Sequence, residues 1–139
     1  MRPPFETFEH TADVGIEARG ASLPELFASA AEGMMSLLID SSAVRATEHR
    51  QVKLAADDFE GLLVDWLNEL LVLLNAESFV PAAFDVTEVS EAHGLTADVA
   101  GEPVDPARHR FRQDVKAATY HQVRVGKNDE WKARVILDV

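Results

Sequence analysis

Residues 57–74 carry the pattern that most restricts the fold of this chain. Apolar side chains recur there at spacings of three and four residues, the period of a helix with a broad apolar face. The apolar positions are Leu62, Leu63, Trp66, Leu67, Leu70, Leu71 and Leu74. Asp57, with Glu60 three residues later, predicts the N-terminal cap. Such a face must be covered by other elements, so we expect this helix at the centre of the core.

A second helix is predicted from Leu23 to about Ile39. Ser22 and Glu25 form a capping box, and Pro24 falls where a helix needs no backbone donor. The apolar stripe of this segment consists of Leu23, Leu26, Phe27, Ala30, Met34, Leu37 and Leu38. Its spacing predicts burial against a sheet.

The remaining segments alternate polar and apolar residues, the pattern of half-buried strands. We expect two short strands around a turn in residues 5–19, one strand in 51–56, and a hairpin from residue 84 to 99 that turns at His93-Gly94. Two more strands, 115–125 and 131–139, should pair antiparallel through residues 126–129. Gly101-Glu102-Pro103 and Asp105-Pro106 predict a loop.

This order of elements predicts an α+β fold in which two main helices pack on a largely antiparallel sheet. The chain of 139 residues is long enough for one core, so we expect a single domain over residues 1–139. The segment at the N-terminus lacks an apolar signal region, and no stretch approaches the roughly 20 apolar residues of a membrane span. We therefore expect a cytoplasmic protein that does not contact membranes.

The charge and the residue types exclude several classes of function. The formal net charge of -11 disfavours direct, strong binding of nucleic acid, because an acidic surface repels phosphates. The absence of cysteine excludes disulfides, thiolate zinc sites and thiol nucleophiles. No glycine-rich phosphate loop and no Gly-x-Ser-x-Gly motif occurs. We expect no catalytic residues in this chain.

Two acids at the borders of predicted strands, Asp13 and Asp138, are the candidate metal ligands. If the first and last strands are neighbours, the carboxylates converge and require a proton, a cation or a donor between them. A hard divalent ion (Ca²⁺, Mg²⁺ or Mn²⁺) would satisfy them, and an oxygen of Val139 could be added. From spacing alone, two unrelated acids at the surface are the simpler interpretation.

Four further residues are candidates for a functional or partner-facing role. Lys116 could neutralise an acidic cluster or form an ordinary cross-strand ion pair. His10 is either a surface residue or a hydrogen-bonded anchor for Asp13. Glu69, on the flank of the helix predicted at residues 57–74, either is solvated or faces the acidic site. His121 shares a predicted strand with Lys116, but the histidines lack the spacing of a zinc site.

At these same residues the sequence resembles the archease family, over nearly its whole length. The matching blocks are His10, Thr11, Ala12, Asp13 and Gly15; Leu26, Phe27, Ala30 and Gly33; Leu62, Leu63, Trp66, Leu67, Asn68, Glu69, Leu70 and Leu71; Gly101, Glu102 and Asp105; Lys116 to His121; and Leu137 with Asp138. Val139 departs from the pattern, since other members often end in isoleucine. The ordered set of blocks is more specific than any one of them.

The resemblance implies a protein that activates an RtcB-type RNA ligase, which uses GTP and a metal to join RNA ends in tRNA splicing and RNA repair. An archease speeds guanylylation of the ligase. The family's metal ligands correspond to Asp13, Asp138 and a main-chain oxygen of Val139, and Lys116 matches a functionally important lysine.

Two alternatives remain open at the level of sequence. The first is a chaperone-like modulator whose acidic surface binds basic clients without a metal, suggested by fold analogy. The second is a metal-dependent hydrolase, in which two carboxylates and a cation would generate a nucleophilic water.

Overall fold

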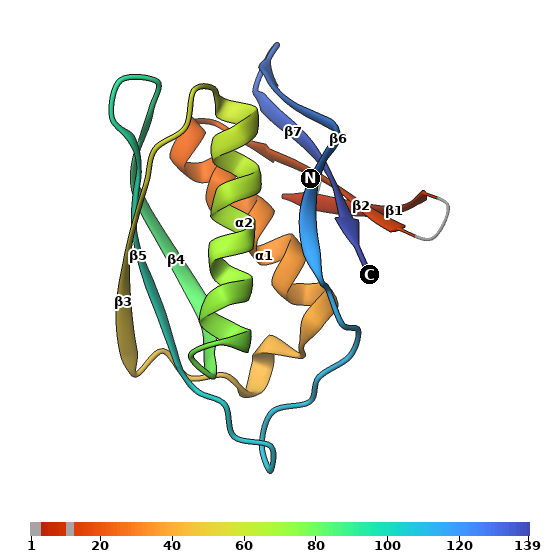
Figure 1. Cartoon of the computed structure of the whole chain (residues 1–139), viewed down its shortest axis with the longest axis vertical. Helices are drawn as coiled ribbons and strands as arrows, with labels where there is room; N and C mark the ends of the chain where they lie inside the picture. The colour runs from red at the N-terminus through yellow and green to blue at the C-terminus, as the bar shows by residue number, and fades with distance from the viewer. Residues whose placement is uncertain (1–3, 11–12) are drawn as a thin grey trace.

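The computed structural model describes residues 4–10 and 13–139, without the side chains of Glu9 and His10. Two helices lie between two antiparallel sheets (Figure 1). The elements are β1 (Phe5–His10), β2 (Asp13–Gly20), α1 (Leu23–Leu38), a short 3-10 helix (Ser41–Ala43), β3 (Glu48–Leu54), α2 (Phe59–Asn75), β4 (Phe79–Ser90), β5 (Gly94–Pro103), β6 (Ala117–Lys127) and β7 (Trp131–Asp138). The predicted α+β class is confirmed.

The strands divide into two sheets rather than the single sheet that the pattern suggested. One sheet has the order β1-β2-β7-β6 and the other the order β3-β5-β4, and the strand pairs in both are antiparallel. The first sheet joins the two ends of the chain, because β2 and β7 are neighbours at its centre. The hairpins β4–β5 and β6–β7 form as predicted.

The helices begin at capping residues, one of them a residue later than predicted. The Ser22 hydroxyl accepts a hydrogen bond from the Glu25 N–H at 3.3 Å, as expected for α1. In α2 the cap is Asp58, which accepts from the Gly61 N–H at 2.7 Å, and not Asp57. Both positions are aspartates, so the pattern did not distinguish them. The Glu60 carboxylate instead accepts from the Val125 N–H of β6 at 3.0 Å.

The core lies around the two helices and explains why α2 is apolar over so much of its surface. α1 contacts β1, β2 and β7 on one side and β4 on the other, and α2 likewise contacts both sheets. Trp66 is fully buried, as predicted, and its Nε1–H donates to the Phe27 carbonyl of α1 at 2.9 Å. In the part of the chain described here, neither helix has the length and apolar composition needed to cross a membrane.

Several strand boundaries differ from the sequence prediction, and β3 spans Glu48–Leu54 instead of residues 51–56. β4 begins at Phe79, and the register with β5 shifts between Pro81 and Ala83; β4 is an edge strand, where proline is tolerated. β5 continues to Pro103 instead of breaking at Gly101, because residues 101–103 pair with residues 79–81. Lys116 lies just before β6 rather than inside it.

Candidate functional site

The chain ends meet in one row of paired residues, which we call the end rung. His10 is the register partner of Asp13, Asp13 is the partner of Asp138, and Asp138 is also the partner of Ala117. The row crosses all four strands of the first sheet. The structure thus places the two candidate carboxylates directly opposite each other, although they are 125 positions apart in the sequence.

The pairing of Asp13 with Asp138 has an electrostatic cost. Opposed residues of antiparallel strands project from the same sheet face, with Cβ atoms about 5 Å apart. Two carboxylate charges at about 5 Å repel each other by about 1 kcal/mol in water and by about 3 kcal/mol at an effective dielectric constant of 20. Asp13 is half-buried and Asp138 is exposed, which favours the lower value. A cation between them would turn this repulsion into attraction.

The donor set fits a hard divalent ion that keeps part of its water. Asp13 and Asp138 offer side-chain oxygens, and Val139 follows Asp138 with a main-chain oxygen. The Asp138 carbonyl already accepts from the Lys116 N–H at 2.8 Å. Across the described residues, no three His, Cys, Asp or Glu side chains gather into a metal cage. A donor set with only two carboxylates leaves coordination positions open. Such a set suits Mg²⁺, or an ion whose coordination another molecule completes, better than it suits Ca²⁺ in a closed cage.

The other predicted residues lie at different distances from the end rung. The His10 side chain falls outside the described residues, as do Thr11 and Ala12, whereas the main chain of Lys116 bonds directly to Asp138 and its side chain is exposed. Glu69 follows Asn68, which contacts the start of β6. His121 is exposed and lies four residues along β6 from Ala117, in the stretch between Thr119 and Arg124 where the register with β7 is irregular.

Comparisons with known proteins identify the family of this chain. The model of the archease protein family (MTH1598/TM1083) matches residues 5–139. The chain belongs to the archease family. Protein archease of Methanosarcina acetivorans is 40% identical over 97% of this chain and 95% of its own, and that of Pyrococcus abyssi is 34% identical over 97% and 98%. The solution structure of Methanobacterium thermoautotrophicum protein 1598 has a TM-score of 0.86 at 38% identity, covering 99% of this chain and 100% of that one.

Asn68, within one of the archease-like blocks, fixes β6 to α2. Its amide nitrogen donates to the Ala118 carbonyl at 3.2 Å, and its amide oxygen accepts from the Ala118 N–H at 2.8 Å. The side chain therefore pairs with β6 as a neighbouring strand would, on the outer edge of the sheet. Asp65, one turn earlier, accepts from the Tyr120 hydroxyl at 3.4 Å, and its negative charge raises the pKa of that phenol. These contacts position the strand that carries Lys116 at its start.

Gly15, another residue of the archease-like blocks, makes room for Phe8 beside the end rung. A Cβ atom on Gly15 would lie 1.9 Å from Cζ of the Phe8 ring. Gly15 is the partner of both Phe8 and the buried Ile136. The residues two positions from the carboxylate pair along β2 and β7, Gly15 and Ile136, therefore offer no polar side chain to Asp13 or Asp138.

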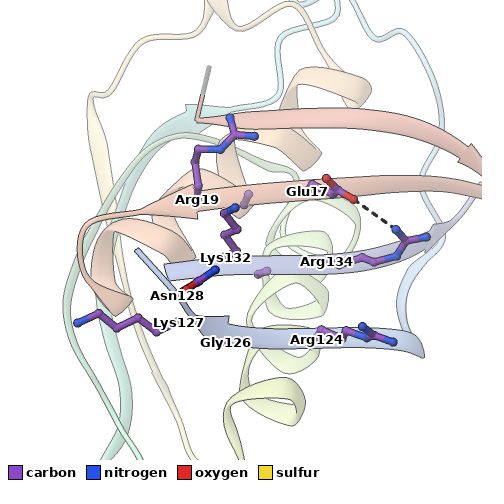
Figure 2. A pocket seen from close by; sticks show the side chains of 10 residues that line it. Glu17, Arg19, Arg124, Gly126, Lys127, Asn128, Lys132 and Arg134 are labelled. Atoms are coloured by element: carbon purple, nitrogen blue, oxygen red, sulfur yellow. Dashed lines mark hydrogen bonds and ion pairs between the residues drawn. The ribbon is translucent and has the colours of Figure 1, made fainter. Parts of the chain in front are cut away.

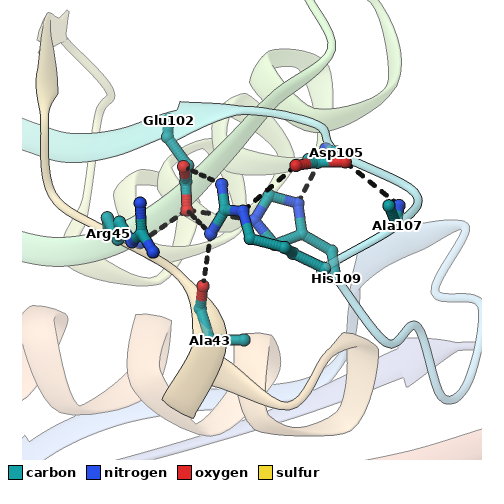
Figure 3. Close-up of polar contacts among 7 residues, drawn as sticks. Ala43, Arg45, Glu102, Asp105, Ala107 and His109 are labelled. Atoms are coloured by element: carbon teal, nitrogen blue, oxygen red, sulfur yellow. Dashed lines mark hydrogen bonds and ion pairs between the residues drawn. The ribbon is translucent and has the colours of Figure 1, made fainter.

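A buried polar cluster closes the loop after β5 and was not predicted from the sequence (Figure 3). Glu102 accepts hydrogen bonds from the Arg45 N–H at 2.6 Å, from Arg108 Nη1 at 3.2 Å and from His109 Nε2 at 3.0 Å. His109 Nδ1 accepts from the Asp105 N–H at 2.9 Å, which assigns the ring proton to Nε2. The Arg108 guanidinium, followed by these other donors, lowers the pKa of Glu102 to about 2.

The Glu102 cluster holds loop segments together rather than presenting a reactive group. Glu102 and His109 are both buried, and Arg108 also donates to the Ala43 carbonyl at 3.0 Å. The sequence signal was the block Gly101, Glu102 and Asp105, which marked the site but not the partners that the fold supplies.

Proposed function

We propose that this chain binds a divalent metal ion at the end rung and activates a GTP-dependent, RtcB-type RNA ligase in the cytoplasm, without being an enzyme itself. Activation would consist of promoting guanylylation of the ligase, in tRNA splicing and RNA repair. The observation that carries the proposal is the direct register of Asp13 with Asp138, in a chain of the archease family.

Three features of the end rung support a role at a contact with another protein. The carboxylates lie at the rim of the sheet, where Asp138 is exposed and Asp13 half-buried. Their donor set leaves coordination positions open for water or for a group of a partner. Lys116 immediately precedes β6, with its main chain bonded to Asp138 and its side chain exposed. A lysine beside an anionic site is suited to contact a phosphate as a point charge.

The metal ion would supply positive charge that makes the carboxylate pair compatible with an approaching nucleotide or acidic group. The chain's own residues would do the remaining work. Asp13 and Asp138 hold the charge at the sheet rim, and Asn68 keeps β6 and its preceding lysine in place through Ala118. The ligase would contribute the nucleophile and the GTP site, because this sequence carries neither motif.

The proposal is tested with two variants that remove one charge each, Asp13→Asn and Asp138→Asn. Asp129→Asn, on the exposed turn between β6 and β7, is the matched control. Binding of Mg²⁺, Mn²⁺ and Ca²⁺ is measured by calorimetry, and covalent guanylylation of an RtcB-type ligase is measured with labelled GTP. We expect metal affinity and the stimulation of ligase guanylylation to fall about tenfold or more in both end-rung variants, because each variant loses a charged group of the metal site. The control should match the parent protein.

Full stimulation of guanylylation by Asp13→Asn and Asp138→Asn would reject the proposal. A different result would favour the chaperone-like alternative: both variants would still suppress aggregation of basic client proteins, and neither they nor the parent protein would stimulate the ligase. That alternative draws on the net charge of -11 and needs no metal.

A further inference from the structure

The outer face of the first sheet carries a group of cations, although the net charge of the chain is -11. We call this group the basic face; it consists of Arg19 of β2, Arg124 and Lys127 of β6, and Lys132 and Arg134 of β7 (Figure 2). These residues line a hollow of about 380 Å³, in which Glu17 is the one acidic lining residue. Five of the 13 basic residues of an acidic chain thus share one surface.

The register places like charges opposite each other on the basic face. Arg134 is the partner of Arg124 on one side and of Glu17 on the other, and Lys132 is the partner of Arg19. Like charges directly opposite across strands destabilise a sheet. The register therefore gathers four cations in two like-charged pairs, and one member of each pair, Arg134 or Arg19, also has a carboxylate partner.

The cations differ in how far they are already neutralised. Arg134 pairs with Glu17 at 3.3 Å, and Arg19, whose side chain is 11% exposed, pairs with Glu6 at 3.3 Å. Arg124 and Lys132 are exposed, and within residues 4–10 and 13–139 no ion pair joins them to a carboxylate. Lys127 lies at the rim as the partner of Trp131, with its Nζ 5.9 Å from the centre of the Trp131 ring. Arg124 and Lys132 therefore have charge available for a ligand.

A glycine opens the space between these cations. Gly126 is the partner of Lys132, and a Cβ atom built on it meets no atom within 4 Å. The hollow is lined by charged residues, Asn128, this glycine and two buried alanines, Ala18 and Ala133. The surface offers charge and hydrogen-bond donors but no apolar pocket that would anchor a peptide side chain.

We propose that the basic face binds the sugar-phosphate backbone of a single-stranded nucleic acid. Arginine forks and lysines are the usual partners of phosphate oxygens. The face spans three strands, roughly 10 Å, which is wide enough for one sugar-phosphate backbone. A single strand has a lower charge density than a duplex, so a chain with a net charge of -11 repels it less. This inference uses different residues from the end rung and does not depend on the proposed function.

Two observations favour phosphate over an acidic peptide and predict little sequence preference. A peptide could not add a strand beside β6, because Asn68 and Glu60 of α2 already bond to that edge. The nearby aromatic rings are also covered: the Arg134 guanidinium lies 4.2 Å from the centre of the Phe8 ring, and Trp131 packs edge-on against Phe59. Without a free stacking platform, bases contribute little.

The binding is expected to be moderate and strongly dependent on salt. Acidic residues dominate the rest of the surface, and the end rung lies about 20 Å from Lys132 along β7, from the six-residue separation. A strand bound at the basic face would avoid those carboxylates. The net charge keeps the overall affinity low, in agreement with the expectation that this chain does not bind nucleic acid strongly.

The test uses fluorescence anisotropy of a labelled oligouridine of about twelve nucleotides at about 50 mM salt, without divalent ions. The variants are Arg124→Ala with Lys132→Ala, and Gly126→Val, which fills the hollow without changing charge. The matched control is Lys53→Ala with Arg110→Ala, which removes two exposed cations elsewhere. Circular dichroism verifies that each variant is folded.

We expect the Arg124 and Lys132 double variant to weaken binding about tenfold and to reduce the slope of log affinity against log salt by about 1.4, from loss of two phosphate contacts. Gly126→Val should weaken binding severalfold, and the control should remain within about threefold of the parent protein. Oligothymidine of equal length should bind equally well. Equal weakening by the control, no binding by the parent protein, or tighter binding of polyglutamate than of oligouridine would each overturn the proposal.

Discussion

Replacing Asn68 by alanine should destabilise the protein and weaken its metal site together. The Asn68 amide makes both hydrogen bonds to the main chain of Ala118, at 2.8 and 3.2 Å, on an otherwise open sheet edge. Ala118 is buried, so its N–H and carbonyl have little access to replacement water. Each lost hydrogen bond costs about 1 kcal/mol, and a buried group left unsatisfied costs about 1–3 kcal/mol.

We therefore expect Asn68→Ala to lower the free energy of unfolding by about 2–3 kcal/mol. For a chain of this length, the entropy of unfolding is about 0.3 kcal/mol per kelvin, so the midpoint of thermal unfolding should fall by roughly 7–10 °C. Since β6 begins beside Asp138, the affinity for a divalent ion should fall as well. Asn75→Ala, at the exposed end of α2, is the control and should change the midpoint by no more than about 2 °C.

Urea denaturation followed by Trp fluorescence measures the change in unfolding free energy, and calorimetry measures metal affinity. A loss of less than about 0.5 kcal/mol for Asn68→Ala, the range of neutral surface substitutions, would refute the argument that this side chain acts as the neighbour of β6.

Three further predictions concern single residues. Gly15→Ala should lower the unfolding free energy in urea by about 1 kcal/mol, because the Phe8 ring must move aside, and a Phe8→Ala background should remove most of this loss. The protein should lose stability as the pH falls from about 4.5 to about 2, because Glu102, with a folded-state pKa of about 2, stabilises the fold only while ionised. Acid titration of Glu102→Gln should lack this component, and an unchanged acid profile would contradict it. With a chelator present, Asp13→Asn should raise the unfolding free energy by about 1 kcal/mol, because the repulsion with Asp138 is lost. At a saturating concentration of divalent ion, Asp13→Asn should instead have the lower unfolding free energy, because only the parent protein is stabilised by the bound ion.

The helices could be predicted because their signals are local. Ser22 caps α1 through an atom three residues away, and the apolar spacing of α2 follows from helical geometry alone. The meeting of the chain ends was only a condition of the metal-site hypothesis, because no local pattern pairs strands that far apart, and β2 and β7 are indeed neighbours. The prediction erred where adjacent residues were chemically alike, as with Asp57 and Asp58, and where Gly101 and Pro103 continued a strand through pairing with β4.

The basic face could not be predicted because it depends on register. Arg124 and Arg134 are neighbours only after β6 passes its irregular stretch, where Gln122 has a φ of 55°. The net charge of the chain gives no sign of these cations, because acidic residues outnumber basic ones. The alternation of Lys132 with Arg134 was the one local signal. The Glu102 cluster was hidden for the same reason, since its donors come from segments on both sides of β5.

The most direct test of the metal site at the end rung is an anomalous diffraction measurement on crystals soaked in Mn²⁺. We predict one strong peak between Asp13 and Asp138, with an oxygen of each carboxylate within about 2.0–2.6 Å of the ion. An ordered Mn²⁺ ion bound elsewhere, with no peak between these two carboxylates at a saturating concentration, would contradict it.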